Sequence, residues 1–369
     1  MHSESPQDRL LTGKRLGALC ATTLGVILTL GLWPFCAPRN AVAWIPGSNG
    51  LLFGDAGTAV SRPDFPPAAP PGAPCSLEIW AKPARTQASG TLAAFYTPRN
   101  RESFALRQSL SDLALQRSGP GTSRFYVNDV FRAARPVFLT ISSGPHGTAV
   151  YVDGVLRRAA SGFRIGAAAC SGRLVVGTSP IENDSWTGVL RGLAIYRSEI
   201  GLAAALRHYQ TWSRDGHPAQ DAGDASAALF LFDERGGDWA YDRNPAGPDL
   251  FLPQEYELQN QAFLEPFWQE FELSWSYFRS AVKNIVGFVP LGFFFYAWFL
   301  TKAPARRATR RAVLLGFAVS LTIEVLQGFL PTRDSGTTDL ITNTLGTWLG
   351  VLLFRRVGPA LRAGGRNDR

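Results

Sequence analysis

The chain has 369 residues, of which 46% are hydrophobic and 18% charged, and its formal net charge is +8 at pH 7. This length leaves room for two domains, and the composition fits either a globular or a partly membrane-embedded protein. The positive charge does not indicate a nucleic-acid partner, because thirteen of the 37 Lys and Arg residues flank apolar runs and no basic-aromatic recognition motif occurs.

A first apolar run, L-G-A-L-C-A-T-T-L-G-V-I-L-T-L-G-L-W-P-F-C, covers residues 16–36 and follows a Lys-Arg pair. It carries no charge and is long enough to cross the ~30 Å hydrocarbon core of a bilayer. We predict a transmembrane helix over residues 16–38, preceded by a cytoplasmic tail at 1–15. A cleaved signal peptide is the alternative, since A-V-A at 41–43 resembles a cleavage site. In both cases the residues that follow are exported.

Short alternating runs separated by turn signals fill the next part of the chain. The Asp153-Gly154 pair between β-rich flanks predicts a hairpin, because both central positions of the favoured turn require positive φ. Many short strands at this spacing indicate an all-β sandwich. The expected strands cover residues 76–82, 124–131, 136–144, 148–158, 172–178 and 189–196.

The four cysteines divide between the two regions. Cys20 and Cys36 lie in or beside the first apolar run, whereas Cys75 and Cys170 lie in the expected sandwich. An exported pair of cysteines can oxidise, so we predict a disulfide between Cys75 and Cys170. Two buried free thiols are the alternative.

Four motifs of the sandwich follow one another along the chain: W-I-P-G-S-N-G-L-L-F at 44–53, C-S-L-E-I-W-A-K-P at 75–83, Y-V-D-G at 151–154 and W-T-G-V-L-R-G-L-A-I-Y-R-S at 186–198. In this order they resemble the laminin G, concanavalin A-like jelly rolls over residues 42–212, and we place the domain at 42–232. The resemblance implies binding of glycans or proteins, in some relatives with calcium, which is the only cofactor left open. Hydrolase relatives use an E-x-D-x-x-E strand, which this sequence lacks.

Residues 233–280 are expected to form a linker. Its last part, N-Q-A-F-L-E-P-F-W-Q-E-F-E-L-S-W-S-Y-F at 260–278, is rich in aromatic residues. Because amphipathic rings favour the headgroup region of a bilayer, we predict an interfacial segment on the outer leaflet. An aromatic face packed on the sandwich is the alternative.

Three further apolar spans are predicted at 284–300, 312–330 and 339–354. The loop 301–311 and the tail 355–369 each carry five basic residues, whereas the loop between them carries only Arg333, so the positive-inside rule places loop and tail in the cytoplasm. The prediction is therefore a multi-pass protein of the cytoplasmic (inner) membrane, with four transmembrane helices, both termini cytoplasmic and residues 39–283 extracytoplasmic.

Polar residues interrupt these spans. On helices, Glu324 and Gln327 share a face, as do Asp339 and Asn343, while Asn284 stands at the outer start of its span. A carboxylate in hydrocarbon costs roughly 2.5–3.5 kcal/mol on insertion scales, so such groups face a bundle interior or a wet cavity. We predict one polar cluster near the outer surface, with Arg333 as a counter-charge. Its role is either structural, by hydrogen bonding between helices, or functional, in handling a substrate or a proton.

The same spans resemble the VanZ-like membrane family. Three motifs occur in the family's order: N-I-V-G-F-V-P-L-G-F at 284–293, I-E-V-L-Q-G-F-L-P-T-R at 323–333 and D-L-I-T-N-T-L-G at 339–346. The likeness covers 280–354 directly, makes 16–38 the family's first helix, and assigns Pro290, Gly292 and Gly346 to the family motif or to helix packing. The family usually has an acidic residue where Ser280 stands, which weakens a mechanism that needs that carboxylate. The family is named for a protein linked to resistance to the glycopeptide teicoplanin, so the resemblance implies a place in cell-envelope biology.

Motifs of other chemistry are absent from the sequence. The histidines His2, His146, His208 and His217 lack metal-ligand spacing, and no G-x-S-x-G, P-loop or H-E-x-x-H occurs. The sequence therefore predicts a multi-domain protein, an all-β jelly roll inserted into a membrane helix bundle, with membrane lipid and an envelope glycan or wall polymer as partners. We expect a non-enzymatic binding protein. The alternative is an enzyme or transporter of a lipid-linked envelope intermediate, working through Glu324 and Asp339.

Overall fold

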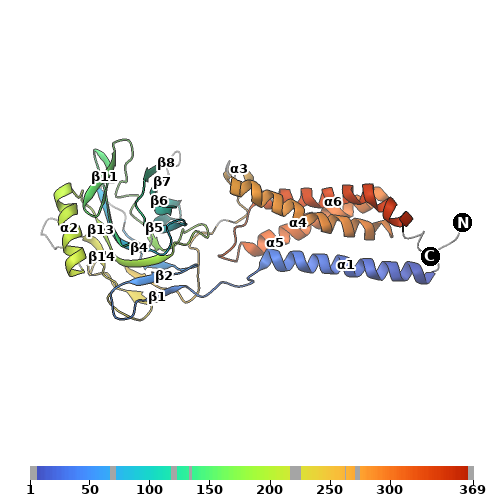
Figure 1. Ribbon diagram of the computed structural model, residues 1–369, viewed down its shortest axis with the longest axis horizontal. Helices are drawn as coiled ribbons and strands as arrows, with labels where there is room; N and C mark the ends of the chain where they lie inside the picture. The colour runs from blue at the N-terminus through green and yellow to red at the C-terminus, as the bar shows by residue number, and fades with distance from the viewer. Residues whose placement is uncertain are drawn as a thin grey trace. The chain divides into compact units, whose positions relative to one another are not determined.

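The computed structural model describes residues 6–66, 72–117, 123–132, 135–216, 226–261, 263–270 and 275–364. The chain forms two compact units. One combines Met1–Cys36 with Ala262–Arg369 and is helical, and the other, Ala37–Gln261, is a β-sandwich (Figure 1). The sandwich is therefore inserted in the sequence between the first long helix and the later ones.

Two antiparallel sheets of eight strands make the sandwich. The first has the order β1-β2-β13-β4-β9-β10-β11, with β14 also paired to β13, and the second has the order β15-β16-β3-β12-β5-β6-β7-β8. The strands of the first sheet are β1 (Val42–Trp44), β2 (Leu51–Phe53), β4 (Cys75–Pro83), β9 (Val137–Gly144), β10 (Gly147–Val152), β11 (Val155–Ala160), β13 (Gly188–Tyr196) and β14 (Ser226–Phe230). Those of the second are β3 (Ala59–Arg62), β5 (Ser89–Thr97), β6 (Asn100–Ser109), β7 (Asp112–Arg117), β8 (Ser123–Val127), β12 (Arg173–Val176), β15 (Trp239–Ala240) and β16 (Asp249–Phe251).

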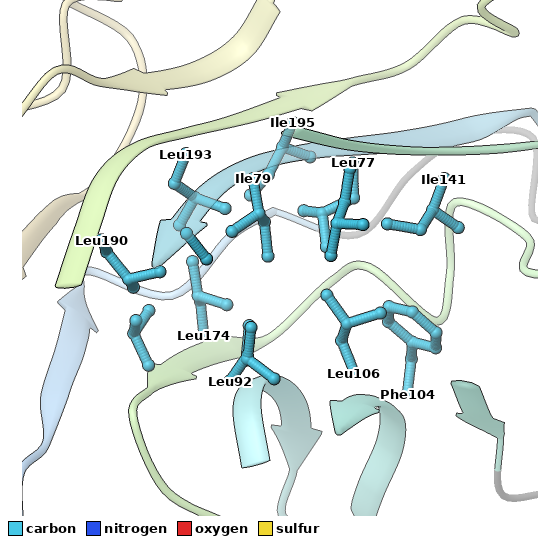
Figure 2. Close-up of a cluster of buried hydrophobic side chains, with 14 of the residues drawn as sticks. Leu77, Ile79, Leu92, Phe104, Leu106, Ile141, Leu174, Leu190, Leu193 and Ile195 are labelled. Atoms are coloured by element: carbon cyan, nitrogen blue, oxygen red, sulfur yellow. The ribbon is translucent and has the colours of Figure 1, made fainter. Parts of the chain in front are cut away.

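The core lies between the two sheets. Leu77 and Ile79 are two positions apart on β4, so they point to the same face and reach the core together. Figure 2 shows them among aliphatic and aromatic side chains of both sheets. Full burial of one such side chain contributes roughly 1.5–3 kcal/mol. The other labelled members of the cluster are Leu92, Phe104, Leu106, Ile141, Leu174, Leu190, Leu193 and Ile195.

The predicted jelly-roll fold, hairpin and disulfide are confirmed. Asp153 (φ 52°) and Gly154 (φ 77°) form the turn between β10 and β11. A disulfide joins Cys75, at the start of β4, to Cys170, shortly before β12. Because β4 and β12 belong to different sheets, this bond ties the two layers of the sandwich together.

Several elements of the sandwich differ from the expectation. The structure adds β5, β6 and β7, ends β8 at Val127 rather than at 131, and places β15 and β16 within the stretch expected as a linker. It also adds helix α2 (Leu202–Asp215), whose buried Trp212 packs on Phe138 of the first sheet. A Cβ on Gly192 would lie 2.1 Å from the Trp212 ring, so glycine is needed there for the indole to lie against β13.

Four long helices and one short one build the helical unit. They are α1 (Pro6–Leu32), α3 (Phe267–Glu270), α4 (Trp275–Leu300), α5 (Ala305–Gln327) and α6 (Thr337–Gly364). Among the described helices, Gly13–Leu32 and Tyr277–Leu300 are long and apolar enough, by length and composition, to cross a membrane. Helices α5 and α6 do not meet the same criteria of length and composition, so two of the four spans expected from the sequence have this support.

Glycines allow α4 and α6 to touch backbone to backbone. A Cβ on Gly346 would lie 2.2 Å from the carbonyl oxygen of Ile285, and one on Gly350 would lie 2.1 Å from that of Val289. The second contact lies four residues further along both helices than the first, so α4 and α6 run parallel. On α4, a Cβ on Gly292 would meet the Thr347 carbonyl at 1.9 Å. Small residues at such spacing are the usual means of close helix packing in membranes.

The disulfide generates a stability prediction. Replacing Cys170 by Ser removes a link across 95 residues of sequence, so we expect the free energy of unfolding of the sandwich to fall by about 2–5 kcal/mol. Pulse proteolysis of the purified protein over a urea series measures this change. Cys36→Ser, which alters an exposed free thiol, is the matched control and should leave the midpoint unchanged. Equal midpoints for the two variants would contradict the stabilising role of the disulfide.

Candidate functional site

Of the six sequence-predicted polar residues, Asn284 lies on α4 and the other five lie on α5, on α6 or in the connection between them. Glu324 and Gln327 stand on the last turn of α5 and are 1% and 8% exposed. Asp339 is in the first turn of α6, and Asn343 follows one turn later with 5% exposure. The structure thus buries Glu324, Gln327 and Asn343, whereas Asn284, Arg333 and Asp339 are half-buried.

Glu324 binds the backbone at the start of α6. Its Oε2 accepts the N–H of Gly336 at 2.9 Å, and its main-chain oxygen accepts the hydroxyl of Ser335 at 2.7 Å. The first N–H groups of a helix lack partners within the helix and carry a partial positive charge, so a carboxylate is stabilised there. In a capping box, an acidic residue of the same helix takes the N-cap N–H. Here the acid comes from α5, so Glu324 fixes the α5–α6 connection.

The segment before α3 covers the same connection. Glu265 donates its N–H to the Ser335 carbonyl at 3.0 Å and accepts the N–H of Thr337 at 2.8 Å, forming a short parallel bridge. Phe263 packs on Gly328 at the end of α5, where a Cβ would lie 2.4 Å from the ring. Part of the expected aromatic segment therefore packs on the helical unit, while Trp268 remains 68% exposed.

Gln327 and Arg333 bind the end of α1. Gln327 donates from Nε2 to the Gly31 carbonyl at 2.8 Å, and Arg333 donates from Nε to the Trp33 carbonyl at 2.9 Å. The Arg333 guanidinium also reaches the Leu30 carbonyl at 3.3 Å. A cation at the carbonyl end of a helix is favourable for the helix dipole. Arg333, expected only as a counter-charge, thus also caps a helix.

Asn343 belongs to a deeper layer between α5 and α6. Its side-chain Nδ2 donates to the hydroxyl of Ser320 at 3.0 Å, and its main-chain carbonyl oxygen accepts the hydroxyl of Thr347 at 3.0 Å. Its Oδ1 and the Nδ2 of Asn284 on α4 are buried atoms without a hydrogen-bond partner in the described part of the chain. The sequence analysis did not anticipate Ser320 or Thr347, because a single hydroxyl within an apolar run gives no signal by itself.

The remaining motif residue, Pro290, lies inside α4. It is exposed, one helical turn after Val286, which is 62% exposed. A proline within a helix has no N–H to donate, so one hydrogen bond of α4 is missing at this point. Ser280, where the family pattern has an acid, is also exposed on α4.

The sandwich has a charged pocket at the edge of its first sheet. A cavity of about 240 Å³ is formed by residues 129–132 after β8, residues 135–137 at the start of β9, and the turn and first residues of the β10–β11 hairpin. Its charged lining consists of two carboxylates and three guanidinium groups, from Asp129, Arg132, Arg135, Asp153 and Arg157. These residues come from three separate segments, so no spacing in the sequence revealed the pocket.

Contacts within the sandwich neutralise part of the charge of the pocket. Arg135 and Asp153 form an ion pair of 3.6 Å, and the second carboxylate oxygen of Asp153 accepts the Phe138 N–H at 3.0 Å. Arg132 and Arg157 are exposed, and neither guanidinium has an ion pair or hydrogen bond with the residues that the structure describes. The pocket therefore presents two unpaired guanidinium groups and the Asp129 carboxylate beside a neutralised pair.

Other buried ionisable groups of the sandwich have structural partners. Glu78, under α2, accepts hydrogen bonds from Thr140 and Tyr196, and His208 Nδ1 lies 3.0 Å from its Oε2. His208 is thus a core residue. On the second sheet, Glu102 accepts the Gln116 amide at 2.8 Å, and burial raises the pKa of its carboxyl.

No cluster of three or more His, Cys, Asp or Glu side chains with metal-binding geometry occurs in the described ranges. His146 lies in the β9–β10 turn, apart from the other described histidine. His2 and His217 lie outside those ranges.

The contact between Glu324 and Gly336 generates a second prediction. Glu324→Ala leaves a buried N–H without its acceptor, at a cost of about 1–3 kcal/mol. We expect a lower thermal midpoint and a lower yield of monodisperse protein in detergent, measured by fluorescence-detected gel filtration. Glu324→Gln keeps an acceptor oxygen and should lose less. Leu326→Ala, at an exposed position of the same turn, is the control. Normal yield and midpoint for Glu324→Ala would instead favour a role in handling a substrate or a proton.

Two protein families match parts of the chain. The concanavalin A-like lectin/glucanases superfamily (laminin G type) matches residues 54–203, and the VanZ/LLP1 family matches residues 236–358. No curated protein matches the chain.

Several solved structures resemble part of the chain at low sequence identity. A SAP-like pentraxin from Limulus polyphemus is 14% identical with a TM-score of 0.36, covering 60% of this chain and 96% of the pentraxin. A putative carbohydrate-binding protein from Bacteroides ovatus is 10% identical with a TM-score of 0.40, covering 58% of each chain.

The receptor-binding domain of botulinum neurotoxin D is 12% identical with a TM-score of 0.38, and the match covers 46% of this chain. This chain spans only 45% of that toxin structure. The assignment therefore rests on the two family models. In agreement with the sequence motifs, the chain combines a laminin G/concanavalin A-like domain with a VanZ-like domain.

Proposed function

We propose that the protein is a membrane-anchored cell-envelope protein whose sandwich binds a glycan or wall polymer. The observation that carries the proposal is a charged pocket in a domain of a lectin superfamily. Carbohydrate sites in proteins need concave surfaces with a few polar groups that fix orientation, and this pocket offers both. The VanZ-like domain supplies the anchor or transmits the contact, and its family resemblance extends the proposal to glycopeptide resistance.

The proposed topology places the sandwich outside the cytoplasm. Two helices have the length and apolarity of spans, and the loop between α4 and α5 is followed by the basic residues Arg306, Arg307, Arg310 and Arg311. We propose that α5 and α6 also lie in the membrane, with both chain ends in the cytoplasm and residues 39–283 outside. The burial of Glu324 and Asn343 supports this, because neither side chain would face lipid. The Cys75–Cys170 disulfide fits an oxidising compartment.

The contacts of the polar cluster favour anchoring over catalysis. The carboxylate of Glu324 binds the start of α6, and Gln327 and Arg333 bind the end of α1. These groups hold helices together in the described structure. We therefore propose that these residues have a structural role. If the binding test described next fails, the alternative, an enzyme or transporter of a lipid-linked substrate, would be favoured instead.

The proposal predicts saturable binding of an envelope polysaccharide. The full-length protein, purified in detergent, is immobilised and exposed to a panel of wall polymers and glycans, each with and without calcium. We expect selective, saturable binding to at least one polymer. Intact disulfide and resistance to trypsin establish that the sandwich is folded in the same sample. A folded protein that binds no member of the panel would contradict the proposed function.

A further inference from the structure

The charge of the sandwich pocket is unbalanced. Its lining holds three arginines and two aspartates, and the ion pair of Arg135 with Asp153 neutralises one of each. Arg132 and Arg157 remain without side-chain partners in the described ranges, and Asp129 supplies the one carboxylate outside the pair. The local charge is therefore positive, and the groups outside the ion pair are two guanidinium forks and one carboxylate.

The strands and turns of the sandwich bring the residues of the pocket together. Val155 and Arg157 both line the pocket from β11, where the pairing with β10 shifts register between Val150 and Tyr151 and leaves Arg157 without a register partner. The hairpin turn that precedes β11 is tied to β9 by Asp153, which accepts the backbone N–H of Phe138. Val130 and Val137, which are 5% and 4% exposed, supply an apolar floor.

The guanidinium group has a distinct ligand preference. Its planar fork matches the two oxygens of a carboxylate or phosphate, and hydrogen bonds between ionised partners are about twice as strong as neutral ones. A neutral sugar would leave both forks of this pocket unneutralised. An anionic group would satisfy them, while the apolar floor accepts the C–H face of the attached sugar ring.

We propose that the pocket selects an anionic glycan, in which a carboxylate or phosphate of one sugar unit is bound by Arg132 and Arg157. The inference rests on the proposed function and names the ligand class of that same domain. Asp129 then lies within the pocket as an acceptor for a hydroxyl of the sugar. Arg135 serves as a positioning residue through its ion pair with Asp153.

The test uses full-length protein in detergent with three immobilised polymers. Phosphomannan carries phosphate, polygalacturonate carries carboxylate, and mannan is the neutral counterpart of phosphomannan. We expect binding to at least one anionic polymer, weaker binding to mannan, and loss of affinity as salt rises, because exposed charges are screened. The double variant Arg132→Gln/Arg157→Gln should weaken anionic binding by roughly 10- to 100-fold.

A matched double variant separates the pocket from net charge. Arg99→Gln/Arg164→Gln removes the same charge from two exposed arginines of the sandwich that do not line the pocket, and it should bind as the unmodified protein does. Arg132→Lys/Arg157→Lys keeps the charge but loses the fork, and an intermediate affinity supports the proposal. Trypsin resistance of every variant checks folding.

The outcomes distinguish this inference from the proposed function. Binding to phosphomannan alone or to polygalacturonate alone supports the inference and identifies the anion as phosphate or carboxylate. Equal binding to mannan and phosphomannan, or equal losses in the pocket and control variants, overturns the inference while glycan binding stands. A folded protein that binds none of the three polymers, nor any other member of the wider panel, overturns both.

Discussion

The structure depends on the attachment of α1 to α4 and α5, which are separated from it in the sequence by the whole sandwich. Closing a loop of this length carries an entropic cost that grows slowly with length, so a modest set of contacts can offset it. Cys20 and Ile27 of α1 pack with Phe288 and Ile323 in one apolar cluster. Gln327 and Arg333 then take the last carbonyls of α1. The chain therefore leaves the helical unit after α1, forms the whole sandwich, and then returns to the same helical unit.

The same requirement explains why polar residues interrupt apolar runs. A helix end buried in an apolar setting leaves backbone groups without partners, and each unsatisfied group is costly. Glu324 satisfies an N–H at the start of α6, and Gln327 satisfies a carbonyl at the end of α1. Gly346 and Gly350 let α4 and α6 approach closely. Polar side chains thus join the helix ends, while glycines let the helix faces pack closely.

Local patterns predicted the features that depend on neighbouring residues. Asp153-Gly154 predicted the hairpin from adjacent residues alone. The disulfide joins residues 95 apart, and it was predicted because the expected sandwich contains only two cysteines and was expected to be exported. Features built from segments that are distant in the sequence were not predicted. The pocket brings together Arg132 and Arg157, which are separated in the sequence by β9 and β10. The partner of Glu324 is a main-chain N–H, which every residue type except proline could supply. Helix α2 was missed because its place is set by the packing of Trp212 on the sheet, including the space left by Gly192.

The central claim is that the sandwich is displayed outside the membrane by the helical unit, and Cys36 tests it most directly. Cys36 is the exposed free thiol of the chain, since Cys20 is buried and Cys75 and Cys170 are joined. A membrane-impermeant maleimide applied to intact spheroplasts that express the full chain should label the protein, and Cys36→Ser should abolish the label. Labelling that requires permeabilised cells would place Cys36 and the adjoining sandwich in the cytoplasm and contradict the account.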